Sequence, residues 1–505
     1  MNQKKAGVIL SYTSEAIKIM TALLYTPVML RLLGQSEYGL YQLVHSVVSY
    51  LGLLSLGFTS AYVRYFSIAK AKGLEDEVAK LNGMFMTIFL VIAGIAALSG
   101  GIMVSNIRAL FSSGLTDQEY EKARILMVLM VFNLSISFPN SVFNCIVSAH
   151  ERFFFQRSLT VLQNLLNPFL TLPLLLMGYG SVGMVLVTTV ITLAKLVTDV
   201  WYVFHKLHAR FLFHGFNFTL LKDIWAFTFF IFLNQIIDQI NWSIDRFLLG
   251  RMIGTTAVAV YGLGAQINTL YVQMSTTISS VFAPQINRMV VQRNDNHELS
   301  ELFTRVGRIQ FILLSLILSG FIFVGHPFMK IWGGSKSYGE SYYVALLLIV
   351  PSTVPLIQNL GIEIQRAKNM HRARSVVYFC IALANVIVSI PLIKKYGVLG
   401  APIGTAVSIT VGNVLFMNWY YDKRIGLEIF RFWENIMSFL PAFIVPILFG
   451  VIITHFWPTE QLGSIIVFAI AYGAVFFASI WLWGMNTAEK DMIRNMYCKI
   501  VRRKK

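Results

Sequence analysis

The chain has 505 residues, of which 56% are hydrophobic and only 13% are charged. This apolar content exceeds what the core of a soluble domain needs, and it excludes an ordinary soluble enzyme. The formal charge of +17 at pH 7 would suit either an anionic membrane surface or a nucleic acid, so the placement of the charges must decide between them.

Fourteen stretches are apolar and long enough to cross a bilayer, which takes about 20 residues of helix. They cover residues 8–30, 40–66, 84–105, 123–147, 158–177, 181–204, 224–249, 257–282, 308–331, 341–362, 376–393, 397–420, 437–456 and 462–484. The loops between them leave no room for a separate catalytic domain, which usually has about 50 residues or more. The sequence therefore predicts an all-α polytopic membrane protein with fourteen transmembrane helices.

The basic residues indicate how the chain is oriented in the membrane. If the chain starts in the cytoplasm, 29 of the 41 Lys and Arg residues fall on that side, 9 on the other side and 3 within spans. The positive-inside rule then places both termini in the cytoplasm. The surplus charge orients the protein and gives no support to a nucleic-acid partner.

The first span carries Ser11, Glu15, Lys18 and Tyr25 on one helical face, because they are spaced by three, four and seven residues. Ionisable groups in hydrocarbon are costly unless they are paired or hydrated. We therefore expect this face to border a cavity.

An internal repeat begins where the first span ends. Arg31-Leu-Leu-Gly34 with Tyr41 recurs 220 positions later as Arg251-Met-Ile-Gly254 with Tyr261, and Tyr179-Gly180-x-x-Gly183 recurs as Tyr396-Gly397-x-x-Gly400. The nearly constant offset indicates that a unit of six spans is used twice, in the same direction, as in transporters with parallel repeats. The predicted divisions are lobes at 1–215 and 216–432, two further transmembrane helices at 433–484, and a basic amphipathic cytoplasmic tail at 485–505.

Polar residues in the fourth to sixth spans can be explained by contacts within the protein, without a ligand. Asparagines in the fourth and fifth spans are more often packing contacts than ligands; they are Asn133, Asn140, Asn144, Asn164 and Asn167. Lys195 and Asp199 in the sixth span are four residues apart and are expected to pair with each other.

The seventh span carries an unbroken polar stripe at helical spacing, formed by Asn234, Asp238, Asn241 and Asp245. Gln266 and Gln273 follow in the eighth span, one heptad apart. The stripe predicts a cavity-lining role, and hydrogen bonding between packed helices is the alternative. In the tail, Asn486 with Glu489 three residues later indicates a capped helix that begins after the last span.

The sequence lacks the motifs of common catalytic sites. We find no phosphate-binding loop with Lys-Ser/Thr and no His-Glu-x-x-His zinc pair. The three cysteines have no metal-ligand spacing. We therefore expect a protein that is not an enzyme and that has no bound cofactor or metal.

The run Pro27-Val-Met-Leu-Arg-Leu-Leu-Gly-Gln-Ser-Glu-Tyr-Gly-Leu-Tyr41, with the later Tyr396-Gly-Val-Leu-Gly400-Ala-Pro-Ile-Gly404, resembles the polysaccharide transporter (oligosaccharide flippase) family. That family belongs with the lipid II flippases and the multidrug and toxin extrusion transporters. The resemblance implies that two six-helix lobes alternate access and move an undecaprenyl-pyrophosphate-linked oligosaccharide across the bacterial cytoplasmic membrane. It also implies membrane lipids as partners, together with the polymerase and glycosyltransferases of the same pathway.

The resemblance divides the polar residues into three groups. Pyrophosphate needs cationic donors, and the candidates are Lys18, Arg31, Arg64 and Arg251. Sugars need amide and aromatic partners, and the candidates are Asn234, Asn241, Trp242, Gln266 and Gln273. The remaining candidates, Glu15, Asp238 and Asp245, are acids that could bind a coupling Na⁺ or H⁺. A cation-coupled multidrug exporter, in which the acids bind the drug, and a lipid II flippase remain the alternatives.

Overall fold

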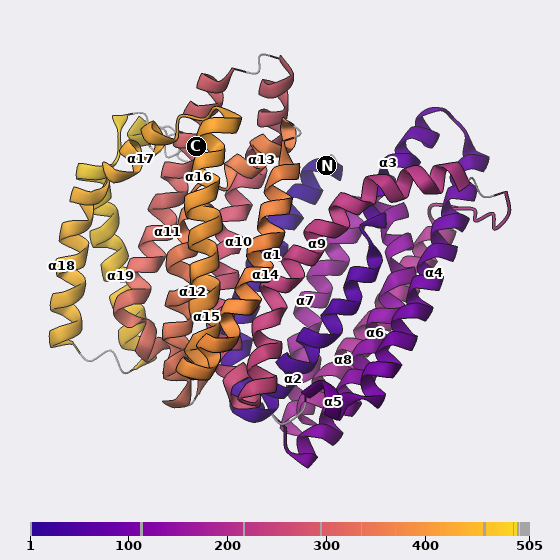
Figure 1. The fold of residues 1–505 in the computed structure, drawn as a ribbon, viewed down its shortest axis with the longest axis horizontal. Helices are drawn as coiled ribbons and strands as arrows, with labels where there is room; N and C mark the ends of the chain where they lie inside the picture. The colour runs from indigo at the N-terminus through magenta and orange to yellow at the C-terminus, as the bar shows by residue number, and fades with distance from the viewer. Residues whose placement is uncertain are drawn as a thin grey trace, which may run out of the picture. The chain divides into compact units, whose positions relative to one another are not determined.

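The computed structural model is a protein of packed α-helices (Figure 1). It describes residues 3–111, 115–215, 218–292, 295–334, 336–368, 370–457, 461–487, 489–491 and 494. Within these ranges there is no β-strand. The predicted all-α fold is therefore confirmed.

Each of the fourteen apolar stretches predicted from the sequence is largely helical in the structure. Among the described residues, nine helices are long and apolar enough to cross a membrane, and a tenth is added if the bent pair Ile429–Met437 and Leu440–Phe456 forms one span. The count of fourteen crossings stays a prediction.

The predicted span 40–66 is broken into separate helices, and the predicted span 341–362 is interrupted by a turn at Gln358 and Asn359. Leu56 and Gly57 adopt left-handed backbone angles, with φ of 50° and 71°, and no α-helix continues through two such residues. The glycine tolerates this conformation because it has no Cβ. The 3₁₀ helix η1, which follows α2 directly at Ser49, therefore ends at Ser55, and α3 begins at Phe58.

The chain divides into two compact units. Unit 1 comprises residues 1–262 and 386–401, and unit 2 comprises residues 263–385 and 402–505. These limits differ from the predicted lobes at 1–215 and 216–432, and the division into lobes stays a prediction.

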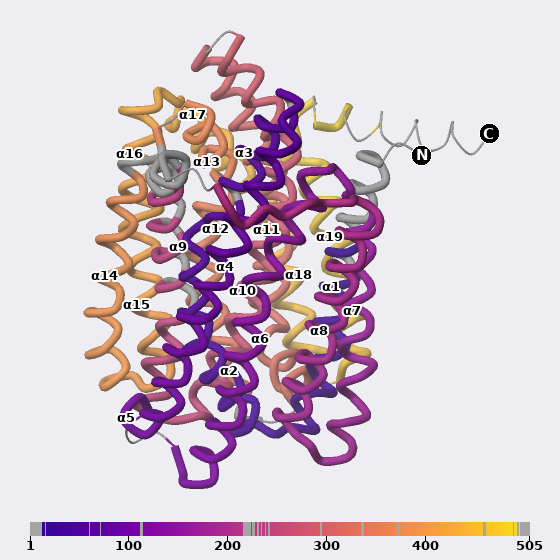
Figure 2. Tube along the Cα trace, turned by 90° about the vertical axis from the view of Figure 1, so that its right-hand side faces the viewer, coloured from indigo at the N-terminus to yellow at the C-terminus, as the bar shows by residue number. Residues whose placement is uncertain are grey.

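Unit 1 is built on long helices that pack side by side. α1 packs against α7, and α6 packs against both α4 and α8 (Figure 2). Phe66, Phe85 and Phe89 are among the buried residues of its core. Its elements are α1 (Gln3–Leu33), α2 (Gln35–Val48), η1 (Ser49–Ser55), α3 (Phe58–Ala71), α4 (Glu75–Ser105), α5 (Ile107–Phe111), α6 (Asp117–Ala149), α7 (Phe153–Leu176), α8 (Gly180–His205), α9 (Phe218–Met252) and the first turns of α10 (Thr255–Gln292).

The first glycine of each repeated motif has positive φ in both copies. Gly34 and Gly254 have φ of 77° and 120° and precede α2 and α10, and Gly180 and Gly397 have φ of 56° and 60°. Positive φ at matched glycines agrees with the internal repeat, since other residues rarely adopt it.

The starts of α2 and α10 lie against each other within unit 1. A Cβ at Gly39 would overlap the carbonyl oxygen of Thr255. The hydroxyls of Ser36 and Thr255 donate to the same carboxylate oxygen, Glu119 Oε1, at 2.5 and 2.8 Å. The glycine and the small hydroxylated residues of the motif therefore allow these two helices to touch.

Unit 2 is built around α11, against which α12, α17, α18 and α19 pack. Tyr472 and Phe476 of α19 are buried in a cluster with residues of α11 and α18. The further elements of the chain are α11 (Asn296–Gly333), η2 (Lys336–Gly339), α12 (Glu340–Ile357), α13 (Leu360–Ala367), α14 (His371–Tyr396), η3 (Gly397–Leu399), α15 (Gly400–Ile409), η4 (Thr410–Phe416), α16 (Met417–Tyr420), η5 (Tyr421–Ile425), α17 (Ile429–Met437), α18 (Leu440–Phe456), α19 (Leu462–Ser479) and η6 (Ile480–Gly484).

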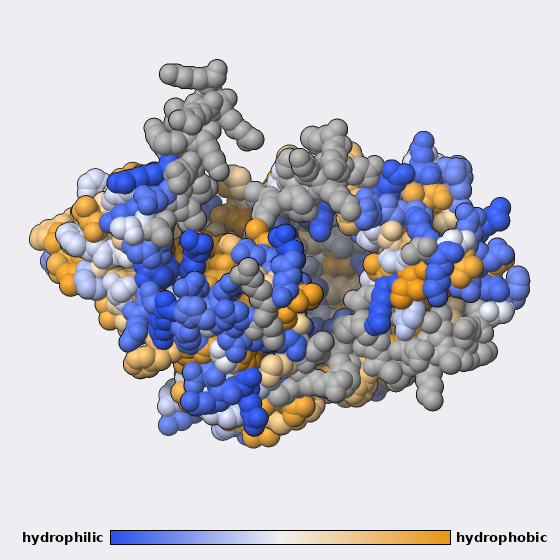
Figure 3. Space-filling model, turned by 90° about the horizontal axis from the view of Figure 1, so that it is seen from above, coloured by the Kyte–Doolittle hydropathy of each residue, from blue (hydrophilic) through white to orange (hydrophobic). Residues whose placement is uncertain are grey.

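The outer faces of α18 and α19 are apolar. Exposed side chains include Ile444, Leu448, Ile466 and Ile470. A soluble protein rarely exposes such a continuous apolar face, whereas lipid covers it in a membrane protein. At the end where α17 lies, hydrophilic residues gather over much of the described surface (Figure 3).

The predicted capping pair after the last span is confirmed. The backbone N–H of Asn486 donates to Glu489 Oε2 at 2.9 Å, and the N–H of Glu489 donates to Asn486 Oδ1 at 2.8 Å. This reciprocal arrangement starts a new helical turn. Residues 495–505, the most basic part of the predicted tail, lie outside the described residues.

Candidate functional site

A cavity of about 330 Å³ lies inside unit 1, between α1, α7 and α8. Its lining comprises Lys18, Thr21 and Tyr25 of α1, Gln163, Asn164, Asn167 and Pro168 of α7, and Thr188, Ile191 and Thr192 of α8. This volume lies at the lower end of the range of small-molecule sites. The cavity contains one of the cations predicted from the sequence, Lys18.

Lys18 occupies the middle of α1, a helix of 31 residues. At 1.5 Å per residue, its Cα lies about 22 Å from either end of the helix. The side chain is exposed, and its ammonium forms no hydrogen bond or ion pair with any residue that the structure describes. A lysine at this depth is costly in hydrocarbon, so its position in a cavity is the one expected of a binding residue.

The other lining groups are neutral, and several can donate and accept hydrogen bonds. Asn164 Nδ2 donates weakly to Ser14 Oγ, at 3.4 Å, and Thr171 Oγ1 donates to Asn167 Oδ1 at 3.3 Å. These bonds use only part of the capacity of each amide, which has two donor hydrogens and two acceptor lone pairs. No carboxylate is among the described lining residues. A single ammonium surrounded by amides and hydroxyls can bind an anionic group that carries sugar hydroxyls.

The amides of α7 are the part of this site that sequence reasoning missed. Asn164 and Asn167 were interpreted as packing contacts, which agrees with the bond from Asn164 to Ser14 of α1, and both also line the cavity together with Gln163. The available signal was their spacing, since positions 163, 164 and 167 share one face of a helix.

The other predicted cations do not line this cavity. Arg31 lies exposed in the last turn of α1, and Arg251 lies exposed in the last turn of α9. Arg64 is exposed on α3, with its guanidinium 5.9 Å from the ring centre of Tyr65. The structure therefore brings Lys18 to the amides of α7 and does not bring the arginines to Lys18.

The polar stripe of α9 is described in part. Asp245 is buried and accepts a hydrogen bond of 2.7 Å from the Tyr261 hydroxyl. Gln239 Nε2 donates to Ser49 Oγ and Ser243 Oγ at 2.5 and 2.7 Å. The bond of Asp245 is what the packing interpretation predicts for this end of the stripe, whereas Gln239 and Ser243 belong to other faces of α9. The side chains of four candidate residues lie outside the described part of the structure; they are Asn234, Asp238, Asn241 and Trp242.

Three further candidates are half-buried. Glu15 lies one turn before Lys18 on α1, and Gln266 and Gln273 lie on the part of α10 that belongs to unit 2. All three have interaction partners. Their binding roles stay predictions.

Lys195 and Asp199 pair with each other on α8, as predicted from their spacing. The Lys195 ammonium lies 3.5 Å from the Asp199 carboxylate and also donates to Asn144 Oδ1 at 3.1 Å. Neither residue lines the cavity.

Comparison with known proteins identifies relatives along most of the chain. The family described as "Polysaccharide biosynthesis protein" matches residues 5–290, more than half of the chain. The "Uncharacterized membrane protein EpsK" of Bacillus subtilis (strain 168) is 21% identical over 444 residues, which is 85% of either chain. The "Putative O-antigen transporter" of Shigella flexneri is 19% identical over 406 residues, 77% of this chain and 91% of that protein.

Among solved structures, the fold is similar to that of "Lipid II flippase MurJ, inward closed conformation". The TM-score is 0.69 at 14% sequence identity, with 94% of this chain and 99% of that chain covered. At this identity the similarity shows the fold and not the substrate. The coverage extends the shared fold beyond residue 290, where the family match ends.

Proposed function

Because the chain belongs to the family of polysaccharide biosynthesis proteins, we propose that it is a flippase for lipid-linked oligosaccharide units in the synthesis of a cell-surface polysaccharide. Family membership is the observation that carries this proposal. The name of the Shigella flexneri relative, "Putative O-antigen transporter", supports the same substrate class. The chain is a multi-pass membrane protein, and we place it in the bacterial cytoplasmic membrane with both termini in the cytoplasm.

The proposed substrate has three parts with different chemical needs. We assign the pyrophosphate group to the Lys18 ammonium, which attracts phosphate as a point charge. The sugar hydroxyls are assigned to the amides of Gln163, Asn164 and Asn167, which offer both donors and acceptors. The polyprenyl chain can stay in the lipid. This division explains why a cavity inside an apolar protein is polar.

Transport by alternating access is the second part of the proposal. The internal repeat, with matched glycines at positive φ, supports it because parallel repeats are a common architecture of such transporters. We keep Glu15, Asp238 and Asp245 as candidates for coupling to Na⁺ or H⁺. Arg31, Arg64, Arg251, Asn234, Asn241, Trp242, Gln266 and Gln273 remain candidates for substrate contacts.

The first experiment separates the flippase from a multidrug exporter. The gene is deleted, the lipids are extracted, and the sensitivity of the cells to cationic dyes is measured. A flippase predicts that lipid-linked glycan accumulates on the inner leaflet and that surface polysaccharide is lost. Normal surface glycan combined with dye sensitivity would contradict the proposal and favour the exporter.

The second experiment tests the assigned role of Lys18. Lys18→Gln removes the charge and keeps a polar side chain of similar size, and Lys18→Arg keeps the charge. We expect Lys18→Gln to abolish complementation of the deletion strain and Lys18→Arg to retain part of it. Lys206→Gln, at the exposed end of α8, is the control and should complement fully. Undiminished surface glycan with Lys18→Gln, at equal protein level, would remove Lys18 from the site.

A further inference from the structure

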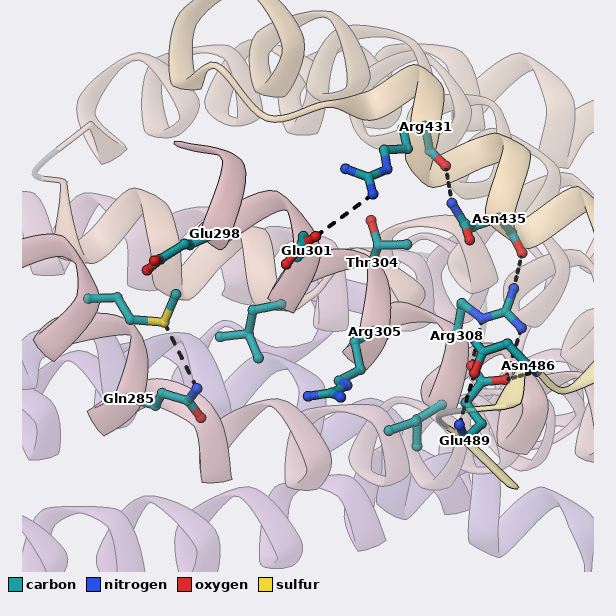
Figure 4. A pocket seen from close by; sticks show the side chains of 13 residues that line it. Gln285, Glu298, Glu301, Thr304, Arg305, Arg308, Arg431, Asn435, Asn486 and Glu489 are labelled. Carbon is teal, nitrogen blue, oxygen red and sulfur yellow. Dashed lines mark hydrogen bonds and ion pairs between the residues drawn. The ribbon is translucent and has the colours of Figure 1, made fainter. Parts of the chain in front are cut away.

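A second cavity, of about 530 Å³, lies wholly within unit 2, where α10, α11, α17 and the segment after η6 meet (Figure 4). Its lining is more strongly charged than that of the Lys18 cavity. The lining comprises Gln285 and Met289 of α10, Glu298, Glu301, Leu302, Thr304, Arg305, Arg308 and Ile309 of α11, Arg431 and Asn435 of α17, and Asn486 and Glu489 of the C-terminal segment.

Arg308 fixes one wall of this cavity. Its side chain is only 5% exposed, and its guanidinium forms a two-pronged ion pair with Glu489, at 2.6 and 2.9 Å. It also donates to the carbonyl oxygens of Asn435 and Gly484 and to the hydroxyl of Ser438. Because these partners belong to α17, to the turn after it and to the chain after α19, one side chain holds three segments in place. The cavity is therefore a built feature of the fold.

Arg305 lies one turn before Arg308, and its guanidinium extends into the cavity (Figure 4). Within the described part of the chain it forms no hydrogen bond or ion pair. Glu301 is in position to pair with it, four residues earlier on α11, but its carboxylate lies instead 3.8 Å from Arg431 and 3.6 Å from His297. Among the described lining residues, Arg308 is paired with Glu489 and Arg431 with Glu301 and Glu428, which leaves Arg305 as the cation available to a ligand.

The cavity is bordered by an amphipathic helix. On α17, Ile429, Phe432 and Ile436 are buried, whereas Arg431 and Asn435 line the cavity. Phe430 is 78% exposed, and the apolar helix α18 begins three residues after α17 ends. Amphipathic helices with exposed aromatic residues beside a span lie at the level of the lipid head groups.

We propose that this cavity binds the phosphate group of a membrane-lipid head group, with Arg305 as the principal contact. Thr304 and Asn435 supply further donors, and Met289, Leu302 and Ile309 supply an apolar wall for the part of the lipid next to its phosphate. Arginine suits this role because its planar guanidinium offers two parallel donors to phosphate oxygens. The predicted topology places this end of unit 2 at the cytoplasmic leaflet.

The test measures lipid binding to the purified full-length chain by native mass spectrometry after delipidation. The probes are phosphatidylglycerol, a polyprenyl phosphate and inorganic phosphate. We expect one tightly held lipid phosphate that millimolar inorganic phosphate does not displace. Arg305→Gln should weaken its binding about tenfold or more, the range expected for loss of a charge-assisted hydrogen bond. Arg305→Lys should weaken lipid binding less than Arg305→Gln does.

Arg424→Gln is the matched control. Arg424 is exposed on η5, lies in unit 2 on the same predicted side of the membrane, and does not line the cavity. The melting temperatures of all variants are compared, so that a folding defect is recognised. Preference for either lipid probe supports the proposal and identifies the lipid. Equal binding by Arg305→Gln and Arg424→Gln would overturn it, as would binding of inorganic phosphate alone.

Discussion

The ion pair between Arg308 and Glu489 gives a sharp prediction about the C-terminal segment. Glu489→Gln keeps the size of the side chain and can keep its cap on Asn486, but it removes the negative charge that faces a guanidinium only 5% exposed. Removing one partner of a buried pair costs about 3–5 kcal/mol, because the other charge is left buried and uncompensated. We expect the variant to avoid much of this cost by releasing the segment after η6, so that Arg308 becomes hydrated.

Limited proteolysis of the full-length protein in detergent is the direct assay for this release. Cleavage after Gly484 should become much faster in Glu489→Gln, and the melting temperature should fall. The control is Arg366→Gln, which removes an ion pair with Glu363 in which Arg366 is 65% exposed. Exposed pairs contribute about 0–1 kcal/mol, so the control should behave like the wild type. If Glu489→Gln were cleaved and melted as the wild type is, the assigned role of the pair would be refuted.

Three further predictions follow from single residues. Gly39→Ala should reduce the yield of folded protein severely, because the new Cβ overlaps the Thr255 carbonyl oxygen. The control Gly94→Ala has no atom near its Cβ position and should change the yield and the melting temperature little. Equal yields of the two variants would contradict the close contact between the helices. Burial and the charges of Lys70 and Arg152 lower the pKa of His150 below 6.5, so its neutral form is favoured on folding and stability should fall as the pH drops through 6.5. His150→Gln should melt with a weaker dependence on pH between 7.5 and 5.5, and an unchanged dependence would exclude the histidine as its source. Asp238→Asn should abolish the response of transport to an imposed ion gradient if Asp238 binds the coupling ion, and a full response in proteoliposomes would exclude that role.

Local patterns in the sequence predicted local structure well. The capping pair of Asn486 and Glu489 is three residues apart, and both of its hydrogen bonds are formed. The Lys195–Asp199 pair is four residues apart and is also formed. In each case the whole interaction lies within about one helical turn, so spacing alone was sufficient.

Interactions between distant segments were beyond what spacing could reveal. Arg308 counted only as one of many cytoplasmic cations, and its partner Glu489 lies 181 residues later in the chain. The amides of α7 were treated as packing contacts because periodicity shows which residues share a face but not what that face meets. The break at Leu56 and Gly57 was missed because an apolar stretch of sufficient length looks the same whether or not its backbone is continuous.

Translocation of a lipid-linked glycan is the central claim, and it can be measured directly in proteoliposomes. A fluorescent polyprenyl-pyrophosphate oligosaccharide is incorporated into both leaflets, and a reductant that cannot cross the bilayer quenches the outer pool. We predict that wild-type protein exposes the inner pool to quenching and that Lys18→Gln does so much more slowly. Quenching that stops at the outer pool with wild-type protein, under conditions in which the protein is folded and a gradient is imposed, would contradict the account.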